Sequence, residues 1–124
     1  HKKLNAKSKV PIFLNLDVDH GNHFSTDKRD GNPYEWLNDL SYLSPSIHIK
    51  QKTKDVYSHK PFIKEYNKTG IIKPEKILAS LEKSNCKNTI LYFEFSFRER
   101  EPFDSQSIKD IKESVKLWRQ YVKE

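Results

Sequence analysis

Three side chains that could bind a metal ion or transfer a proton lie in strand-like apolar segments. Asp17 closes the segment IFLNLD, His48 lies in PSIHIK, and Glu94 closes TILYFE. Carboxylate oxygens and imidazole nitrogens together suit a hard or borderline divalent cation. A loop and then a helical pattern follow each segment, and the ends of parallel strands are where a (β/α) barrel collects its catalytic groups. The sequence therefore predicts one site built from three strand ends.

Each of these residues also has a structural interpretation. A strand-end Asp such as Asp17 often caps the next helix, and His48 between two isoleucines could be a hydrogen-bonded core histidine. Glu94 is harder to explain in this way, because burying a lone carboxylate in an apolar strand is costly. Asp19 fits a loop carboxylate better than a fourth metal ligand. The metal site is the better interpretation of the three residues together.

Size and charge limit the possible classes of protein. The chain has 124 residues, the size of one domain, and a net charge of +6. Its lysines are spread without a block of five like charges, which favours a solvated surface over a nucleic-acid site, although Lys and Arg also bind anionic metabolites. The single Cys86 excludes an intrachain disulfide and a Cys-based zinc site. No apolar segment approaches the ~20 residues of a membrane span, and no signal-peptide pattern is present, so we expect a cytoplasmic protein.

The hydrophobic pattern predicts three consecutive strand–loop–helix units. The expected strands are residues 10–17, 46–50 and 89–95, the first of them buried on both faces. The first helix is expected over 33–42, with Asn32 as N-cap and Pro33 at its first position. The second helix is expected to start within residues 73–75 and to end at 84–85. The third is expected to be capped at 104–105 and to run to about residue 123. A long loop over about 51–73 is of the kind that is usually functional.

Alternating strands and helices indicate an α/β fold with a parallel sheet and right-handed crossovers. Three such units cannot close a barrel, which needs eight strands and typically ~250 residues. An open three-stranded sheet with helices on one side would expose an apolar face. We therefore expect a fragment whose sheet is covered by the remainder of a barrel or by self-association.

Four segments carry a resemblance to a known family: LDVDHG, SIHIKQ, the stretch from His59 to Gly70 that contains HKPF and EYN, and YFEFSFRERE. Over residues 10–119 the chain resembles the C-terminal part of the xylose-isomerase-like TIM-barrel sugar-phosphate isomerases and epimerases. The subgroup acting on short ketose phosphates, such as tetrulose phosphates, is the most similar. The resemblance implies that residues 1–124 are a C-terminal fragment of one TIM-barrel domain, with the last three β-α units, about strands 6–8, of a (β/α)8 barrel.

The resemblance also implies a ligand set and a mechanism. Asp17, His48 and Glu94 match three ligands of one divalent metal ion (Mn²⁺, Co²⁺, Mg²⁺ or Zn²⁺), and a fourth ligand, a Glu of the fifth strand, has no counterpart here. Glu94 would also be the base that removes the proton next to the ketone, giving an enediolate that the metal stabilises. Because one ligand and one acid/base group are missing, we expect this fragment alone to be inactive.

Further positions match groups that contact the substrate. The predicted substrate-binding residues are His20, Gln51, His59, Tyr66, Asn67, Arg98 and Arg100. Arg98 and Arg100 would hold the phosphate, although FRERE could equally be a self-neutralising salt-bridge cluster. Tyr66 could equally pack the long loop down together with Phe62.

The leading hypothesis is a metal-dependent isomerase or epimerase of a short ketose or ketose phosphate. A first alternative is an apurinic-endonuclease-like, metal-dependent DNA repair enzyme, which would need more His, Asp and Glu ligands than the chain shows. A second is a non-catalytic basic module that binds RNA or protein through the aromatic and lysine residues of 57–66. Salt-dependent RNA binding without a metal would favour that module. A small sugar or sugar-phosphate substrate is the expected partner, nucleic acid is unlikely on the ligand and charge patterns, and no membrane partner is expected.

Overall fold

The computed structural model describes residues 2–22, 24–53, 59–97 and 106–122, and the chain divides into two compact units. Unit 1 comprises His1–His48 and Ser80–Tyr92. Unit 2 comprises Ile49–Ala79 and Phe93–Glu124. The boundary passes through the second and third strands and through one helix, so each unit contains pieces from both halves of the sequence.

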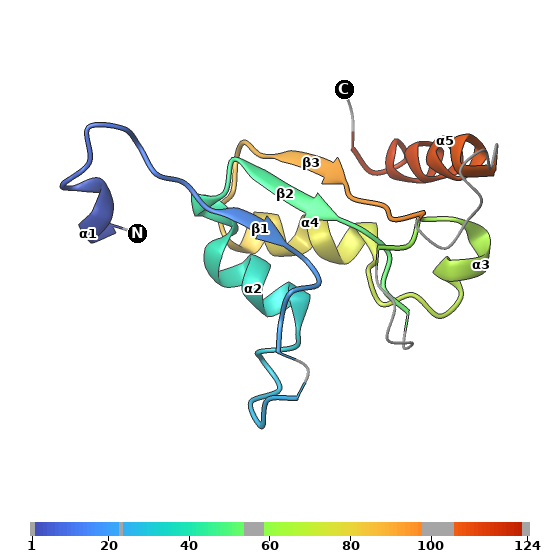
Figure 1. Cartoon of the computed structure of the whole chain (residues 1–124), viewed down its shortest axis with the longest axis horizontal. Helices are drawn as coiled ribbons and strands as arrows, with labels where there is room; N and C mark the ends of the chain where they lie inside the picture. Colours follow the sequence, from blue (N-terminus) through green and yellow to red (C-terminus); the bar gives the residue numbers. More distant parts are fainter. Residues whose placement is uncertain (1, 23, 54–58, 98–105, 123–124) are drawn as a thin grey trace. The chain divides into compact units, whose positions relative to one another are not determined.

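Strands and helices alternate along the chain, as the sequence predicts (Figure 1). The elements are α1 (Lys2–Asn5), β1 (Asn15–Asp17), α2 (Pro33–Leu40), the 3₁₀ turn η1 (Ser41–Leu43), β2 (Ser46–Ile49), α3 (Lys64–Asn67), α4 (Pro74–Lys83), β3 (Ile90–Phe93) and α5 (Gln106–Trp118). The strands form one sheet in the order β1-β2-β3, and β1 pairs with β2 in parallel. The predicted α/β class and parallel sheet are confirmed.

The first strand is much shorter than predicted. Only Asn15–Asp17 pair with a neighbour, and Val10, Ile12 and Phe13 are exposed by 69%, 42% and 59%. Burial of this apolar run on both faces is therefore wrong for its first half. Pro11 has no N–H to donate to a ladder, and the segment is instead held by Asn5, whose side chain bonds the N–H and C=O of Ile12.

Helix α2 begins as the sequence predicts. The side chain of Asn32 accepts a hydrogen bond from the N–H of Tyr34 at 3.0 Å, and Pro33 occupies the first helical position. This arrangement satisfies one of the donors that a helix N-terminus otherwise leaves open. The helix ends at Leu40, two residues earlier than expected, and the chain continues into η1.

The predicted long loop contains regular structure in its described part. Gln51 and Lys60 form an antiparallel bridge, and α3 follows at Lys64–Asn67. Residues 54–58, which include Tyr57 of the predicted RNA-binding stretch, lie outside the described residues. The prediction of an irregular loop over 51–73 is therefore wrong for residues 51, 60 and 64–67.

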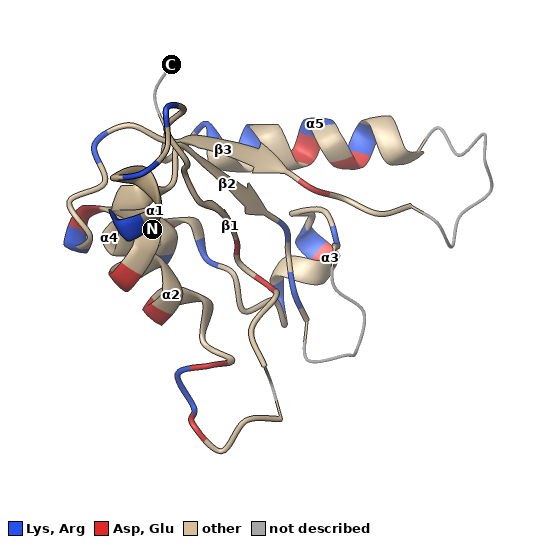
Figure 2. Ribbon diagram, turned by 60° about the vertical axis from the view of Figure 1, so that its left-hand side comes forward, with Lys and Arg blue, Asp and Glu red and all other residues tan. Residues whose placement is uncertain are grey.

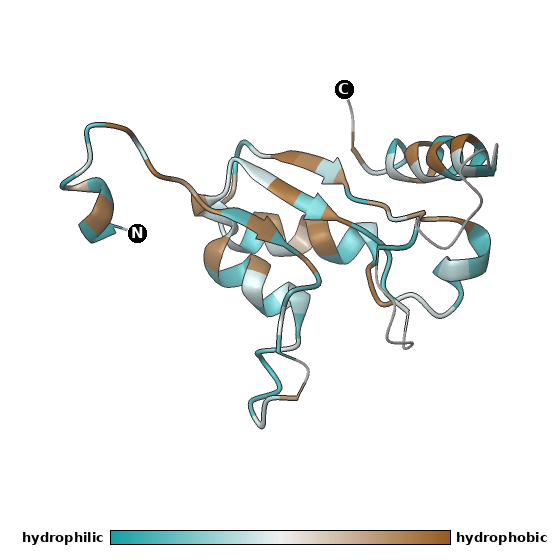
Figure 3. Cartoon of the chain, in the orientation of Figure 1, coloured by the Kyte–Doolittle hydropathy of each residue, from teal (hydrophilic) through white to brown (hydrophobic). Residues whose placement is uncertain are grey.

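The apolar stripe of α5 is only partly buried. Trp118 is 5% exposed, whereas Ile108 and Ile111 are exposed by 60% and 41%. The buried face of the helix is completed by Asp110 and Ser114. Helix α5 therefore packs in unit 2 through a largely polar face, and Figure 3 shows the apolar (brown) and polar (teal) residues alternating around it.

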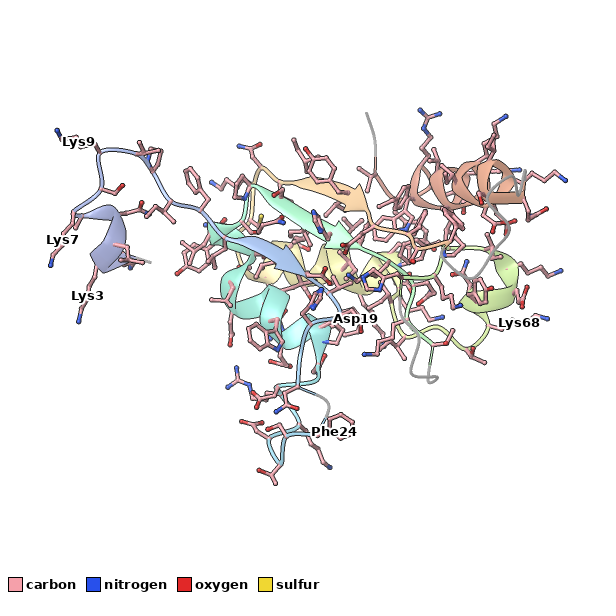
Figure 4. All side chains as sticks on the ribbon, in the orientation of Figure 1. Lys3, Lys7, Lys9, Asp19, Phe24 and Lys68 are labelled. Carbon is pink, nitrogen blue, oxygen red and sulfur yellow. The ribbon has the colours of Figure 1, made fainter. Side chains whose placement is uncertain are left out.

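Charged residues of both signs are interspersed along the described elements. Figure 2 shows Lys and Arg on several helices and loops, with Asp and Glu between them on α5. Lys3, Lys7 and Lys9 project from the N-terminal segment (Figure 4). Among the described helices, none has the length and apolar content needed to cross a membrane.

An aromatic cluster forms the core of unit 2. The ring of Phe62, which is 0% exposed, lies 5.9 Å from that of Phe93, 6.1 Å from that of Phe95 and 5.3 Å from that of Trp118. Aromatic rings at these separations gain from edge and tilted contacts as well as from burial. Phe62 contacts all three partners and is fully buried, so it is the centre of this core.

We predict that Phe62→Ala lowers the free energy of unfolding by about 3–5 kcal/mol, because a large buried ring is replaced by a cavity. Urea unfolding of the purified chain, followed by tryptophan fluorescence, measures the change. Phe24→Ala is the control, since Phe24 is 98% exposed (Figure 4) and its removal should leave stability unchanged. Equal stabilities of the two variants would contradict this assignment of the core.

Candidate active-site residues

In unit 1 the sheet register places two predicted ligands beside each other. Asp17 of β1 pairs with His48 of β2, and His48 Nδ1 lies 4.0 Å from Asp17 Oδ2. The hydrogen bonding continues one residue past this pair, because the N–H of Val18 donates to the carbonyl of His48. Metal bonds to these atom types are about 2.0–2.2 Å long, so donors about 4 Å apart can share one ion. The Asp and His donor types also fit a borderline divalent cation.

The carboxylate of Asp17 is oriented by its own loop. Its Oδ1 accepts a hydrogen bond from the N–H of Asp19 at 2.9 Å, and His20 Nε2 lies 3.1 Å from its Oδ2. The Asp17 side chain is 13% exposed, whereas that of His20 is 70% exposed. Asp17 is thus a fixed, largely buried group, and His20 is a solvent-facing group placed next to it.

Asn15 and Ser46, the ladder pair two residues before Asp17 and His48, support the His48 imidazole. Ser46 Oγ lies 2.7 Å from Asn15 Oδ1, and Asn15 Nδ2 lies 3.4 Å from His48 Nε2. The Ser46 hydroxyl can donate or accept, so the amide of Asn15 can present either its NH₂ or its oxygen to the imidazole. The Asn15 amide can therefore hydrogen-bond to His48 Nε2 in either tautomer of the imidazole, including the one that His48 needs as a metal ligand.

A cavity of about 270 Å³ opens beside Asp17 in unit 1. It is lined by Asn15, Leu16, Asp17, His20, Gly21 and Trp36. Its wall is closely packed, because a Cβ on Gly21 would lie 2.1 Å from the carbonyl oxygen of Asp30. The volume is close to the lower end of small-molecule pockets, about 300 Å³.

In unit 2 the third predicted ligand belongs to a group of ionisable side chains. Glu94 follows β3 directly, and its N–H donates to the carbonyl of Ile49 at 3.0 Å. Its carboxylate Oε2 lies 2.5 Å from Lys50 Nζ and 3.7 Å from His59 Nε2. The Glu94 side chain is 38% exposed. The expected strand over 89–95 is therefore too long at its end, because β3 ends at Phe93, and Glu94 lies past it and is paired with a lysine.

Lys50 is the residue that the sequence analysis missed. It is 0% exposed, and its Nζ lies 3.1 Å from His59 Nε2 as well as within hydrogen-bond distance of Glu94. A buried ammonium is tolerated only when it is paired and hydrogen-bonded. The signal was present in the sequence, because a lysine directly follows the apolar strand segment SIHI, where a solvated side chain is not expected.

The backbone of His59 adopts an uncommon conformation. Its φ is 68°, in the left-handed region that residues other than glycine rarely occupy, and its carbonyl accepts a hydrogen bond from the N–H of Ser96 at 2.9 Å. Strain of this kind costs about 1–3 kcal/mol and is concentrated at functional sites. This predicted substrate contact is therefore held in place by its surroundings.

Gln51 organises the described part of the long loop. The side chain is buried, with its Nε2 donating to Asn67 Oδ1 and to the carbonyl of Ile72, and its Oε1 accepting from the N–H groups of Lys52 and Ile72. Tyr66 is half-buried, with Lys60 Nζ 5.4 Å from its ring centre. These contacts fix the loop, and direct contact of Gln51, Tyr66 or Asn67 with a substrate stays a prediction. Arg98 and Arg100 lie outside the described residues.

Gly70 leaves the space that the Gln51 amide occupies. A Cβ at position 70 would lie 2.1 Å from Gln51 Cδ and 2.4 Å from its Oε1. We predict that Gly70→Ala destabilises the chain by about 1–3 kcal/mol, because the amide must move out of its hydrogen bonds. Urea unfolding measures the change, and in a Gln51→Ala background the same substitution should cost clearly less. An equal cost in both backgrounds would show that Gln51 is not the obstacle.

Comparison with known proteins gives one informative relative. No protein-family model matches the chain. The chain is 36% identical over 117 residues to D-erythrulose 1-phosphate 3-epimerase of Brucella abortus (strain 2308). The match covers 94% of this chain and 38% of that protein, so the chain spans well under half the length of its relative. The resemblance to enzymes of tetrulose phosphates predicted from the sequence is confirmed.

Proposed function

We propose that this chain carries part of the active site of a metal-dependent epimerase or isomerase of a short-chain ketose phosphate. The observation that carries the proposal is the Asp17–His48 pair on neighbouring parallel strands, in a sequence 36% identical to a tetrulose-phosphate epimerase. In this proposal the chain supplies about strands 6–8 of a TIM barrel. The remainder of the barrel, or a second copy, would cover exposed sheet residues such as Ile90 and Tyr92, which are 58% and 48% exposed.

We assign Asp17 and His48 of unit 1 and Glu94 of unit 2 to one divalent metal ion. The assignment rests on the family resemblance, in which these three positions are ligands of a single ion, and on the fit of the donor types. When bound, such an ion would supply positive charge that stabilises the oxygens of an enediolate. Mn²⁺, Co²⁺, Mg²⁺ and Zn²⁺ all accept Asp, His and Glu donors, so the donor set alone selects none of them.

The proton chemistry needs a carboxylate beside the reacting carbon. In a ketose phosphate the hydrogen on the carbon next to the ketone is weakly acidic, and Glu94 is the proposed base that removes it. Return of a proton to the opposite face gives the epimer, and return to the neighbouring carbon gives the isomer. Because both routes share the first step, Glu94 has the same role in either reaction.

The remaining polar residues would hold the substrate. His20, with its side chain exposed and on the wall of the cavity in unit 1, is suited to a substrate oxygen. His59, Tyr66, Asn67 and Gln51 belong to the organised loop of unit 2, and Arg98 and Arg100 are proposed to bind the phosphate as bidentate donors. A DNA repair enzyme and an RNA-binding module are not favoured, since the relative is an epimerase and the basic residues are interspersed with acidic ones.

We predict that Glu94→Gln lowers turnover by about 10²–10⁴-fold in the protein that carries this chain within a complete barrel, because the base is lost while the shape is kept. The assay is deuterium incorporation from D₂O next to the carbonyl of D-erythrulose 1-phosphate, followed by proton NMR. Glu82→Gln, which removes the same charge from an exposed position of α4, is the matched control and should keep its rate. More than about a tenth of the wild-type rate in Glu94→Gln would exclude Glu94 as the base.

We further predict that Asp17→Asn weakens Mn²⁺ binding by at least about tenfold, since one anionic ligand becomes a neutral amide. Isothermal titration calorimetry of the 124-residue chain and of the complete protein measures the affinity. Glu75→Gln, which removes an exposed carboxylate from the first turn of α4, should bind Mn²⁺ like the wild type. Unchanged affinity in Asp17→Asn, or a complete protein that binds no divalent ion, would overturn the metal assignment.

A further inference from the structure

Lys50 contacts Glu94 and His59 but has no role in the proposed function. All three residues belong to unit 2, so their contacts lie within one compact body. Lys50 follows the end of β2 and is 0% exposed, whereas the side chains of Glu94 and His59 are 38% and 31% exposed. The side chain of Lys50 is thus shielded from solvent, and two of the residues it contacts, Glu94 and His59, are used by the proposed mechanism.

The ammonium of Lys50 determines which atoms of its neighbours are engaged. A lysine side chain in its charged form only donates hydrogen bonds. Its Nζ lies 2.5 Å from Glu94 Oε2 and 3.1 Å from His59 Nε2, so a charged Lys50 that donates to both atoms requires both to be acceptors. A neutral imidazole that accepts at Nε2 carries its proton on Nδ1. The position of Lys50 therefore bears both on the orientation of the Glu94 carboxylate and on the tautomer of His59.

We propose that Lys50 is a positioning residue that assigns Glu94 Oε1 to the metal and makes His59 Nδ1–H the donor toward substrate. The assignment to metal and substrate rests on the proposed function, whereas the tautomer of His59 does not. Outer groups that orient ligands in this way typically change metal affinity by about 10–100-fold when they are removed. The lysine would therefore matter to the reaction without touching substrate.

Two physical effects of removing Lys50 predict opposite changes in metal affinity. An ammonium repels a nearby cation, so its loss by itself would strengthen Mn²⁺ binding. Loss of the group that orients Glu94 would weaken Mn²⁺ binding instead. The sign of the change in Lys50→Met, which keeps the length of the side chain and removes the charge, separates a positioning role from simple electrostatics.

The first measurement is the tautomer of His59 by ¹⁵N-detected ring couplings in the labelled chain, at mildly alkaline pH where an ordinary imidazole is neutral. We expect Nδ1–H in the wild type. In Lys50→Met we expect a shift toward Nε2–H, because Glu94 Oε2, 3.7 Å from Nε2, becomes its acceptor. Lys52→Met, the same substitution at a half-buried position two residues further on, should keep the wild-type tautomer. A wild type that already carries Nε2–H overturns the proposal without any variant.

The second measurement is Mn²⁺ affinity by calorimetry for the same variants. A loss of about tenfold or more in Lys50→Met with wild-type affinity in Lys52→Met supports the positioning role. Equal or tighter binding in Lys50→Met overturns it. If Lys50→Met does not fold, the wild-type tautomer decides the proposal, because Nε2–H in the wild type overturns it. Calorimetry uses the complete protein, which carries the fourth ligand; absence of Mn²⁺ binding there counts against the proposed metal site, and the His59 tautomer then decides the role of Lys50.

Discussion

The parallel register between β1 and β2 is the constraint on which the pairing of Asp17 with His48 depends. Side chains alternate between the two faces of a strand, so a slip of one residue would turn Asp17 away from His48. The observed register pairs these residues and continues through the bond from the Val18 N–H to the His48 carbonyl. Three paired positions make a short ladder. Asn32 and Pro33 then determine where helix α2 begins after the loop that follows β1.

Unit 2 has a polar counterpart to this constraint. Its apolar core is the cluster around Phe62, but the segment that carries His59 is organised by buried polar groups, Lys50 and Gln51. Such networks specify one arrangement when every member is satisfied and are unfavourable when one is not. Gly70 shows how closely the network is fitted, since a single methyl group there would collide with the Gln51 amide.

The sequence was sufficient where the signal is local and insufficient where it depends on a partner. The cap at Asn32 and Pro33 is local and was predicted correctly, as was the alternation of the three strands with α2, α4 and α5, whereas α1 and α3 were not predicted. Whether the run from Val10 to Phe13 pairs depends on a neighbouring strand, which begins only at Ser46, and the run is exposed. The burial of Lys50 likewise depends on contacts that its local sequence does not reveal, with His59 in the following loop and with Glu94 beyond the third strand. Asp17 and His48 were predicted to share a site, and the register places them side by side.

The carboxylates of Asp17 and Glu94 are oriented by the same physical device in different units. In each, a donor of the protein holds one oxygen: the N–H of Asp19 holds Oδ1 of Asp17, and Lys50 holds Oε2 of Glu94. A carboxylate held at one oxygen has lost most of its rotational freedom, so less entropy remains to be lost when the other oxygen takes a ligand or a proton. For Asp17 that second oxygen, Oδ2, is the one that faces His20 and His48. Pre-orientation by short-range donors explains how strands of three and four residues can supply carboxylates in fixed orientations, as the proposed function requires.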